Sequence, residues 1–282
     1  FTASAAARRC THGLALCAAP ALLAACSGQP QLSFLNAQGP VAATEAAHFW
    51  LVTTLLFVLV ALPVFIGTVW ILWRYRYGNT RANYAPRWKS FRPLEFFTWG
   101  GPVVIVLFLS VLVWRNTQRL DPYRAIASDA PALHVQVVGY DWKWLFIYPE
   151  LGIASVGQLA FPAGRPLSMD LTTTTVMQSF FIPALGSQIY AMGGMVTQLN
   201  LQADEPGRFL GENTMYNGNG FHAQKFTAAA MTPGDFNDWV QRVRDQGAPL
   251  DAPALNALST RANKDALRAA LPPAAAPDGS VY

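Results

Sequence analysis

The stretch from Val176 to Phe226 decides the fold of this chain. It begins Val-Met-Gln-Ser-Phe-Phe-Ile-Pro-Ala-Leu-Gly-Ser-Gln-Ile-Tyr-Ala-Met-Gly-Gly-Met (176–195) and ends Met-Tyr-Asn-Gly-Asn-Gly-Phe-His-Ala-Gln-Lys-Phe (215–226). A strand, a turn with proline and glycine, a second strand and a glycine-rich loop follow one another here. This order is typical of a β-sandwich that presents its loops at one end.

The same short-strand pattern extends on both sides of this stretch. In Met195–Ala203, apolar residues alternate with polar ones, as in a strand with one buried face. No apolar repeat of helical length interrupts the strands, so a βαβ fold is disfavoured and residues 121–231 are predicted to form an all-β sandwich. The strands are predicted at Leu133–Tyr148, Gly157–Phe161, Leu167–Thr173, Met177–Ile182, Met195–Ala203 and Lys225–Ala230.

A small helical region is predicted after the sandwich, within residues 232–282. Thr232 is a good helix cap, proline follows it, and Asp235–Gln246 places Phe236, Trp239 and Val243 on one face. A second short helix is predicted at 261–271. The Ala- and Pro-rich end, 272–282, is expected to be disordered.

The overall composition indicates a membrane protein. Of 282 residues, 52% are hydrophobic and 13% are charged, against about 25% charged in ordinary soluble domains. From His48 to Trp73 the chain has no charge, and Phe96 to Trp114 is similarly apolar. We predict transmembrane helices at 47–74 and 95–115, because each exceeds or approaches the ~30 Å hydrocarbon core at about 1.5 Å per residue.

The connection between the two spans, residues 75–94, is basic. This loop and its borders carry no acidic residue before Glu95, and the positive-inside rule places it in the cytoplasm. Both ends of the helical hairpin then lie in the periplasm of a bacterial inner membrane. The net charge of +4 comes with no aromatic-plus-basic pattern, so no nucleic-acid partner is expected. The basic residues are Arg74, Arg76, Arg81, Arg87, Lys89 and Arg92.

The first 25 residues have the pattern of a signal peptide. Arg8-Arg9 is followed by an apolar segment too short to span a bilayer. Leu23-Ala24-Ala25-Cys26 resembles the lipobox at which bacterial lipoproteins are cut and lipidated, so we predict a lipid on Cys26; the alternative is an incidental cysteine. Residues 26–46 are predicted to be a polar periplasmic linker. All three cysteines precede residue 27, which excludes a disulfide or thiolate site in the sandwich.

Glu95 lies where the basic loop meets the second span. A carboxylate near a helix N-terminus is favourable for the helix dipole, and this role needs no function. The functional alternative is a point of proton uptake at the cytoplasmic membrane boundary. Position alone leaves both interpretations open.

Two spans, a basic loop and a sandwich resemble subunit II of the haem–copper respiratory oxidases. The similarity covers roughly Cys26 to Trp239, and it is strongest to the bo-type ubiquinol oxidase branch. This resemblance implies a cupredoxin-like sandwich. It is carried by the lipobox, Trp73-Arg-Tyr-Arg, Tyr140-Asp-Trp-Lys-Trp-Leu-Phe-Ile-Tyr-Pro-Glu and Ser179-Phe-Phe-Ile-Pro-Ala-Leu-Gly-Ser-Gln-Ile-Tyr-Ala-Met.

The resemblance also identifies what this chain lacks. In the cytochrome c oxidase branch a His after Val-x, and later Cys-x3-Cys-x3-His-x2-Met, hold a binuclear copper centre, because thiolate, imidazole and thioether groups suit copper. Here the two His positions hold Gln178 and Gln224, the Cys positions Tyr216 and Gly220, and the Met position Thr227. We therefore predict that no metal is bound at these lost copper-ligand positions.

Other residues near these positions have ordinary interpretations. Gly218 occupies the position of a Glu that donates its backbone carbonyl in the copper branch. His222 lies two residues from the His position, and a lone imidazole without thiolate partners is interpreted as a loop or surface residue. Met192 and Met195 are interpreted as core filler.

Without this copper centre, the resemblance implies a lipid-soluble electron donor, a quinol, in place of cytochrome c. Subunit I is expected to hold the haems, the remaining copper and most of the quinol site, and this chain is expected to bind no cofactor. It would serve as a structural and proton-path subunit of a proton-translocating ubiquinol oxidase. Glu95 matches a Glu near the mouth of a proton channel. Trp142 and Trp144 match an aromatic motif that we interpret here as core and interface residues.

A second hypothesis belongs to another functional class. The chain could be a non-catalytic, membrane-anchored cupredoxin-like lipoprotein, a scaffold or assembly factor for a respiratory complex. A copper-handling assembly factor would need a Cys-x3-Cys or Met/His cluster, which the sequence lacks. A cytochrome c-accepting oxidase subunit is excluded by the missing ligands.

Overall fold

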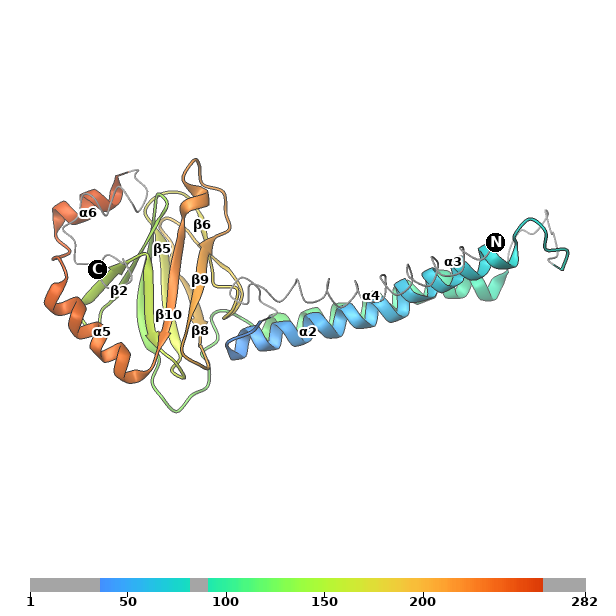
Figure 1. Cartoon of the computed structure of the whole chain (residues 1–282), viewed down its shortest axis with the longest axis horizontal. Helices are drawn as coiled ribbons and strands as arrows, with labels where there is room; N and C mark the ends of the chain where they lie inside the picture. The colour runs from blue at the N-terminus through green and yellow to red at the C-terminus, as the bar shows by residue number, and fades with distance from the viewer. Residues whose placement is uncertain (1–35, 82–90, 261–282) are drawn as a thin grey trace, which may run out of the picture. The chain divides into compact units, whose positions relative to one another are not determined.

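The computed structural model describes residues 36–81 and 91–260. The chain divides into two compact units, one comprising residues up to Ala43 together with Ile126 onwards, and the other Thr44–Ala125. The predicted signal peptide, Cys26, residues 82–90 of the basic loop, the helix predicted at 261–271 and the tail 272–282 lie outside the described residues. Figure 1 shows both units.

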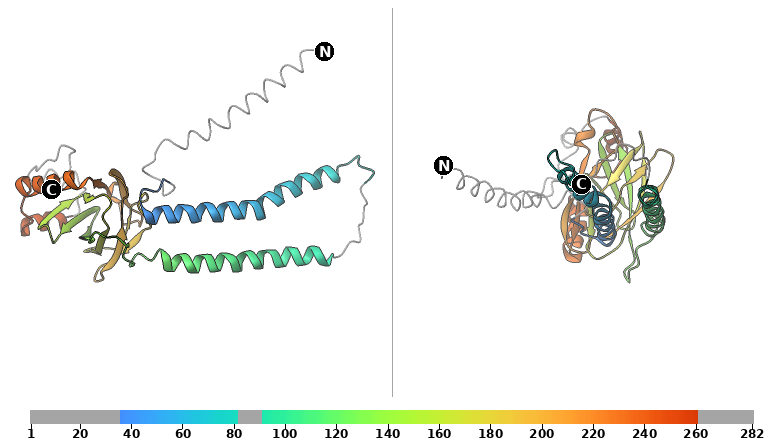
Figure 2. Two further views of the ribbon diagram at one scale, coloured as in Figure 1. Left: turned by 90° about the horizontal axis from the view of Figure 1, so that it is seen from below. Right: turned by 90° about the vertical axis from the view of Figure 1, so that its right-hand side faces the viewer.

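The Thr44–Ala125 unit consists of long apolar helices. Helix α2 (Pro40–Leu56) begins in the sandwich unit and continues through a π-helical turn, Phe57–Ala61, into α3 (Leu62–Arg74), as one helix in Figure 2. The π-turn immediately precedes Pro63, which has no N–H to donate to the preceding turn. This 35-residue helix and the 28-residue α4 (Arg92–Arg119) are long and apolar enough to cross a bilayer.

The helices extend beyond the spans predicted at 47–74 and 95–115. Hydropathy marks only the bilayer-crossing portion, whereas backbone hydrogen bonding continues into the polar flanks. The predicted linker 26–46 is correspondingly wrong at its end, because α2 begins at Pro40. Gln38, two residues before this helix, is held to the sandwich. Its N–H donates to the Ala184 carbonyl at 2.8 Å, and its carbonyl accepts from the Asp204 N–H at 2.9 Å.

The other unit is a sandwich of two five-stranded sheets, which confirms the all-β prediction. One sheet has the order β3-β2-β1-β5-β8 and the other β4-β10-β9-β6-β7. Strands β1 and β5 pair in parallel, as do β4 and β10, and the remaining pairs are antiparallel. The strands are β1 Leu133–Tyr140, β2 Lys143–Tyr148, β3 Ile153–Val156, β4 Gln158–Pro162, β5 Leu167–Thr173, β6 Gln178–Phe181, β7 Ile189–Ala191, β8 Thr197–Leu201, β9 Gly207–Asn213 and β10 Lys225–Met231.

An aromatic cluster fills the space between the sheets. The rings of Phe180 and Phe226 stack with centroids 4.8 Å apart, and Trp144 meets Phe180 edge-on at 5.2 Å. Trp144 and Phe180 are fully buried. The interpretation of Trp144 as a core residue is therefore confirmed.

The structure corrects the strand predictions at four places. Leu133–Tyr148 is two strands, because Tyr140 pairs with Lys143 across the two-residue turn Asp141–Trp142. Trp142, the second residue of this turn, has a positive φ of 61°, a conformation that glycine usually supplies. Strands β3, β7 and β9 were not predicted. In β9, glycine at 211 breaks the alternating pattern, and the Phe226 ring occupies the place of its missing side chain.

Two short helices follow the sandwich. Helix α5 (Pro233–Gln246) confirms the predicted helix, and Thr232 accepts from the Asp235 N–H at 3.2 Å. It buries Phe236, Trp239 and Val243 against the sheets. Helix α6 (Ala252–Ser259) was not predicted. Its N-cap is Asp251, and Leu258 packs on the outer face of β1 and β2.

Candidate functional site

Two of the predicted lost-ligand positions come together at one end of the sandwich. Gln178 begins β6, and Gln224 ends the 214–224 loop that joins β9 to β10. The Gln224 side-chain N–H donates to the Gln178 side-chain oxygen at 2.6 Å. The two residues are 46 positions apart, and the antiparallel arrangement of β6, β9 and β10 makes them neighbours.

This pair belongs to a larger network of side-chain amides, which we call the amide network: Asn213, Asn217, Gln178 and Gln224. The Gln224 oxygen accepts from Asn213 at 2.9 Å and from Asn217 at 2.7 Å. The Gln178 nitrogen donates to the Tyr140 carbonyl at 2.9 Å. The network therefore links the end of β1, the start of β6, the end of β9 and the loop before β10.

Backbone groups at both ends determine the direction of these hydrogen bonds. The Tyr140 carbonyl only accepts, so Gln178 must present its nitrogen there and its oxygen to Gln224. The Asn213 oxygen accepts from the N–H groups of Ser179 and Met215, which leaves its nitrogen for Gln224. The hydrogen bonds run from Asn213 through Gln224 and Gln178 to the Tyr140 carbonyl. The two fixed ends therefore determine the orientation of each side-chain amide between them.

The amide network is withdrawn from solvent. Gln178 is 0% exposed and Gln224 is 1% exposed. Burying an amide without partners costs on the order of 1–3 kcal/mol in proteins, and these hydrogen bonds offset that cost. The network thus cross-links four segments without any net charge.

Trp142 closes the outer side of the same loop. Its indole N–H donates to the Asn217 carbonyl at 3.3 Å. The ring lies directly on Gly220, so a Cβ at that position would overlap indole atom Cδ2. Gly139 is under a similar constraint, because an added Cβ would lie 2.8 Å from the Gln178 side-chain oxygen. Glycines at 139 and 220 are therefore part of the site.

The remaining predicted positions do not join the network. Tyr216 is 72% exposed and its ring faces Phe221 at 5.6 Å. Thr227 lies inside β10, where its N–H donates to the Gly157 carbonyl at 3.1 Å. Gly218 has a φ of 110° beside the Trp142 ring. His222 is exposed in the short 3-10 turn Phe221–Ala223, which agrees with its interpretation as a surface residue.

The interpretation of the methionines needs correction. Met195 is 54% exposed, because β8 begins only at Thr197 and Met195 lies in the preceding turn. Met192 is half-buried and its carbonyl accepts from the Thr172 hydroxyl at 3.3 Å. Neither belongs to the buried core cluster among the described residues.

The chemistry of these positions does not suit copper. The five lost-ligand residues offer no thiolate, imidazole or thioether. The oxygens of Gln178 and Gln224 are hard donors that already accept hydrogen bonds. Within residues 36–81 and 91–260, no three His, Cys, Asp or Glu side chains form a group that could hold a metal. The arrangement is suited to rigid cross-linking.

Sequence analysis missed Asn213, Asn217 and Gly139. Their only signal was indirect: asparagines flank the glycine-rich loop, and Gly139 interrupts an otherwise β-branched and aromatic run. Glu95 belongs to the Thr44–Ala125 unit and is exposed in the first turn of α4, where its N–H donates to the Phe91 carbonyl at 3.1 Å. An acidic residue there is favourable for the helix dipole.

Comparison with known proteins identifies the family. No protein-family model matches the chain. The ubiquinol oxidase subunit 2 of Acetobacter aceti is 44% identical over 234 residues, covering 82% of this chain and 74% of that protein. This chain belongs to the ubiquinol oxidase subunit 2 family. Membership confirms the resemblance to this family. The two candidate spans and the two five-stranded sheets agree with the expected membrane protein that carries a β-sandwich.

Other members show the same relationship. The cytochrome bo(3) ubiquinol oxidase subunit 2 of Pseudomonas aeruginosa is 43% identical over 82% of this chain and 69% of that protein. The quinol oxidase subunit 2 of Bacillus spizizenii is 32% identical over 90% of this chain and 78% of its own length. The solved periplasmic domain of cytochrome oxidase subunit II from Bradyrhizobium japonicum aligns with 44% of this chain and 100% of that domain, at 18% identity and a TM-score of 0.41.

Proposed function

We propose that this chain is subunit II of a proton-translocating ubiquinol oxidase that reduces oxygen to water, and that its own role is structural and in the proton path. Family membership supports the enzyme, since the relatives are named as quinol and ubiquinol oxidase subunits. The amide network supports the structural role. On the resemblance of the sequences, Gln178 and Gln224 occupy copper-ligand positions of the cytochrome c branch, and here they bond to each other and to Asn213.

The electron path follows from this chemistry. Uncharged amides do not accept or release electrons at biological potentials, so electrons would bypass this chain. A quinol dissolved in the membrane would deliver them to the haems and copper of subunit I, the principal partner. The sandwich then supports the complex on the periplasmic side, with its cross-linked end held rigid by the amide network. Cytochrome c would have no electron acceptor here.

The membrane arrangement proposed for the chain has three parts. A signal peptide ends at residue 25, Cys26 carries the lipid, and the two spans cross the inner membrane. The basic loop 75–94 lies in the cytoplasm, so the sandwich lies in the periplasm. Glu95 at the cytoplasmic end of α4 would then take up protons. Its exposure in the described chain leaves the carboxylate accessible to water or to a partner subunit.

Oxygen consumption by the purified complex tests the function. The complex containing this chain is offered ubiquinol, menaquinol or reduced cytochrome c in separate cells. Oxidation of a quinol alone is the expected result. Oxidation of cytochrome c would overturn the proposed electron path. A preparation with neither activity nor haem would favour the scaffold or assembly-factor hypothesis instead.

A further inference from the structure

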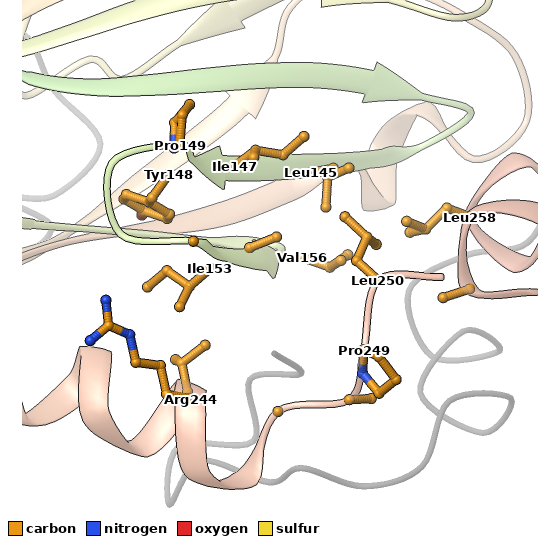
Figure 3. A pocket seen from close by; sticks show the side chains of 16 residues that line it. Leu145, Ile147, Tyr148, Pro149, Ile153, Val156, Arg244, Pro249, Leu250 and Leu258 are labelled. Carbon is orange, nitrogen blue, oxygen red and sulfur yellow. The ribbon is translucent and has the colours of Figure 1, made fainter. Parts of the chain in front are cut away.

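A groove lies between the sandwich and the α5–α6 region, far in sequence from the amide network. One wall is the outer face of β2 and β3, with Leu145, Ile147 and Val156. The other wall is the end of α5, the connection after it and α6, with Leu250 and Leu258 (Figure 3). Its volume is about 480 Å³, within the usual range of roughly 300–1,000 Å³ for small-molecule sites.

The apolar wall results from strand β2 being buried on both faces. Trp144, Phe146 and Tyr148 face the main core, so the residues between them point outwards. Such an outer face is usually polar when it meets water. Here Leu258 covers part of it, whereas Ile147 is only half-buried and Leu250 is 42% exposed. Apolar surface therefore remains uncovered inside the groove.

One charged residue lines this groove, Arg244 near the end of α5. It lies at the opposite end from Leu258 in Figure 3. One guanidinium nitrogen donates to the Leu151 carbonyl at 2.7 Å, which holds the group at the rim. Among the described residues, no carboxylate forms an ion pair with it. Its other N–H groups are suited to an anion, which guanidinium binds through charge-assisted hydrogen bonds.

We propose that this groove binds a single-chain anionic amphiphile, a long-chain fatty acid. The acyl chain lies along Ile147, Val156 and Leu250, and the carboxylate accepts from Arg244. The apolar walls and the single cation at one end complement the two parts of such a molecule. The inference is independent of the proposed electron path, because none of these residues contacts the amide network.

The test uses the full-length chain in lipid nanodiscs, with palmitic acid carrying a photoactivatable diazirine as the probe. After irradiation, mass spectrometry locates the labelled peptides. Labelling of the membrane spans reports partitioning and serves as an internal reference. We expect labelling of the segments 145–156 and 243–258 that excess palmitate suppresses. Methyl palmitate, which lacks the carboxylate, should compete roughly tenfold less well.

Matched variants distinguish binding of the fatty acid in the groove from its nonspecific association with the protein. Leu250→Glu and Arg244→Gln change exposed residues of the groove and should each reduce its labelling roughly tenfold relative to the spans. Leu255→Glu is the control, because Leu255 is 40% exposed on α6 and does not line the groove. Equal labelling in all variants, or equal competition by the methyl ester, would overturn the proposal. So would labelling that appears only after removal of residues 261–282, since the chain's own end would then be the occupant.

Discussion

The side-chain nitrogen of Gln224 lies 2.6 Å from the side-chain oxygen of Gln178, and both residues are buried. These are the positions at which the copper branch, on the resemblance of the sequences, has two imidazoles. In this chain a direct hydrogen bond between two neutral amides joins the two segments. This end of the sandwich is therefore cross-linked without a charged group.

Removing one member of the pair tests the energetic importance of the amide network. Gln178→Leu leaves the Tyr140 carbonyl and the Gln224 nitrogen without their partner. We expect the free energy of unfolding to fall by about 1–3 kcal/mol. Urea unfolding followed by near-ultraviolet circular dichroism measures the change. Gln241→Leu on the exposed face of α5 is the control, with an expected change below about 0.5 kcal/mol.

The double variant Gln178→Leu/Gln224→Leu distinguishes a network from two independent residues. Replacing both partners removes the unpaired groups between them, so its cost should be smaller than the sum of the single costs. Strict additivity would contradict direct coupling between the two amides.

The contact between Trp142 and Gly220 gives a second prediction. Gly220→Ala places a methyl group within the indole ring, and such overpacking costs about 1–3 kcal/mol. Trp142→Gly in the same chain removes the ring and also suits the positive φ at 142. The double variant should therefore lose less stability than the sum of the single variants, as measured by thermal unfolding.

Gly193→Ala is the matched control for this contact. The nearest atoms to a Cβ at 193 are 3.6 Å away, which is ordinary van der Waals contact. If Gly193→Ala and Gly220→Ala unfold at the same temperature, the close packing of Trp142 on Gly220 has no energetic consequence.

The burial of Lys143 leads us to expect that the free energy of unfolding depends on pH. It is 3% exposed and donates to the Thr260 carbonyl after α6 at 2.6 Å. Burial lowers the pKa of Lys143, and the charge of Asp141 opposes this only in part. Between the folded-state pKa and the unfolded value of about 10.4, the unfolded chain binds more protons, so stability rises with pH in this window.

The comparison with Lys143→Met isolates this contribution. The difference in unfolding free energy between the wild type and Lys143→Met should shift in favour of the wild type as pH rises towards about 10.4, and then level off. Urea titrations at several pH values measure it. A difference that moves in the opposite direction would mean that the folded state stabilises the ammonium form.

Substitutions of Glu95 test the proposed proton path. Glu95→Gln keeps the size of the side chain and removes its ability to carry a proton at neutral pH. We expect slower oxygen consumption with ubiquinol and slower proton uptake from the cytoplasmic side, with the complex still assembled. Glu95→Asp retains the carboxylate and should restore part of the rate. Unchanged turnover in Glu95→Gln would leave the residue with its helix-dipole role only.

Substitution of Cys26 tests the proposed lipid anchor. Cys26→Ala should abolish incorporation of radiolabelled palmitate, because no other cysteine follows residue 26. The protein should nevertheless stay in the membrane fraction through α2–α3 and α4. Cys17→Ala is the control and should still be labelled. Release of Cys26→Ala into the soluble fraction would show that the two apolar helices do not anchor the chain.

Much of the fold was predictable because it depends on local patterns. Apolar runs without charge indicated α2–α3 and α4. Alternation indicated β8, and the pattern of short strands indicated β5 and β10, all within two residues of their ends. The misses have identifiable causes. Strand β7 is only three residues long, β9 pairs with the distant β6 and is interrupted by Gly211, and the turn at Asp141–Trp142 has no glycine to mark it.

The order of residues was sufficient to predict that these positions bind no copper, because ligand chemistry depends on residue type and they hold none of the required groups. The amide network, in contrast, depends on contacts between residues far apart in the chain. Nothing in residue type predicts that Gln178, Asn213 and Gln224 share hydrogen bonds, or that Trp142 covers Gly220. Those contacts arise only when antiparallel pairing brings the ends of four segments to the same place, because hydrogen bonds act over about 3 Å whatever the separation in sequence.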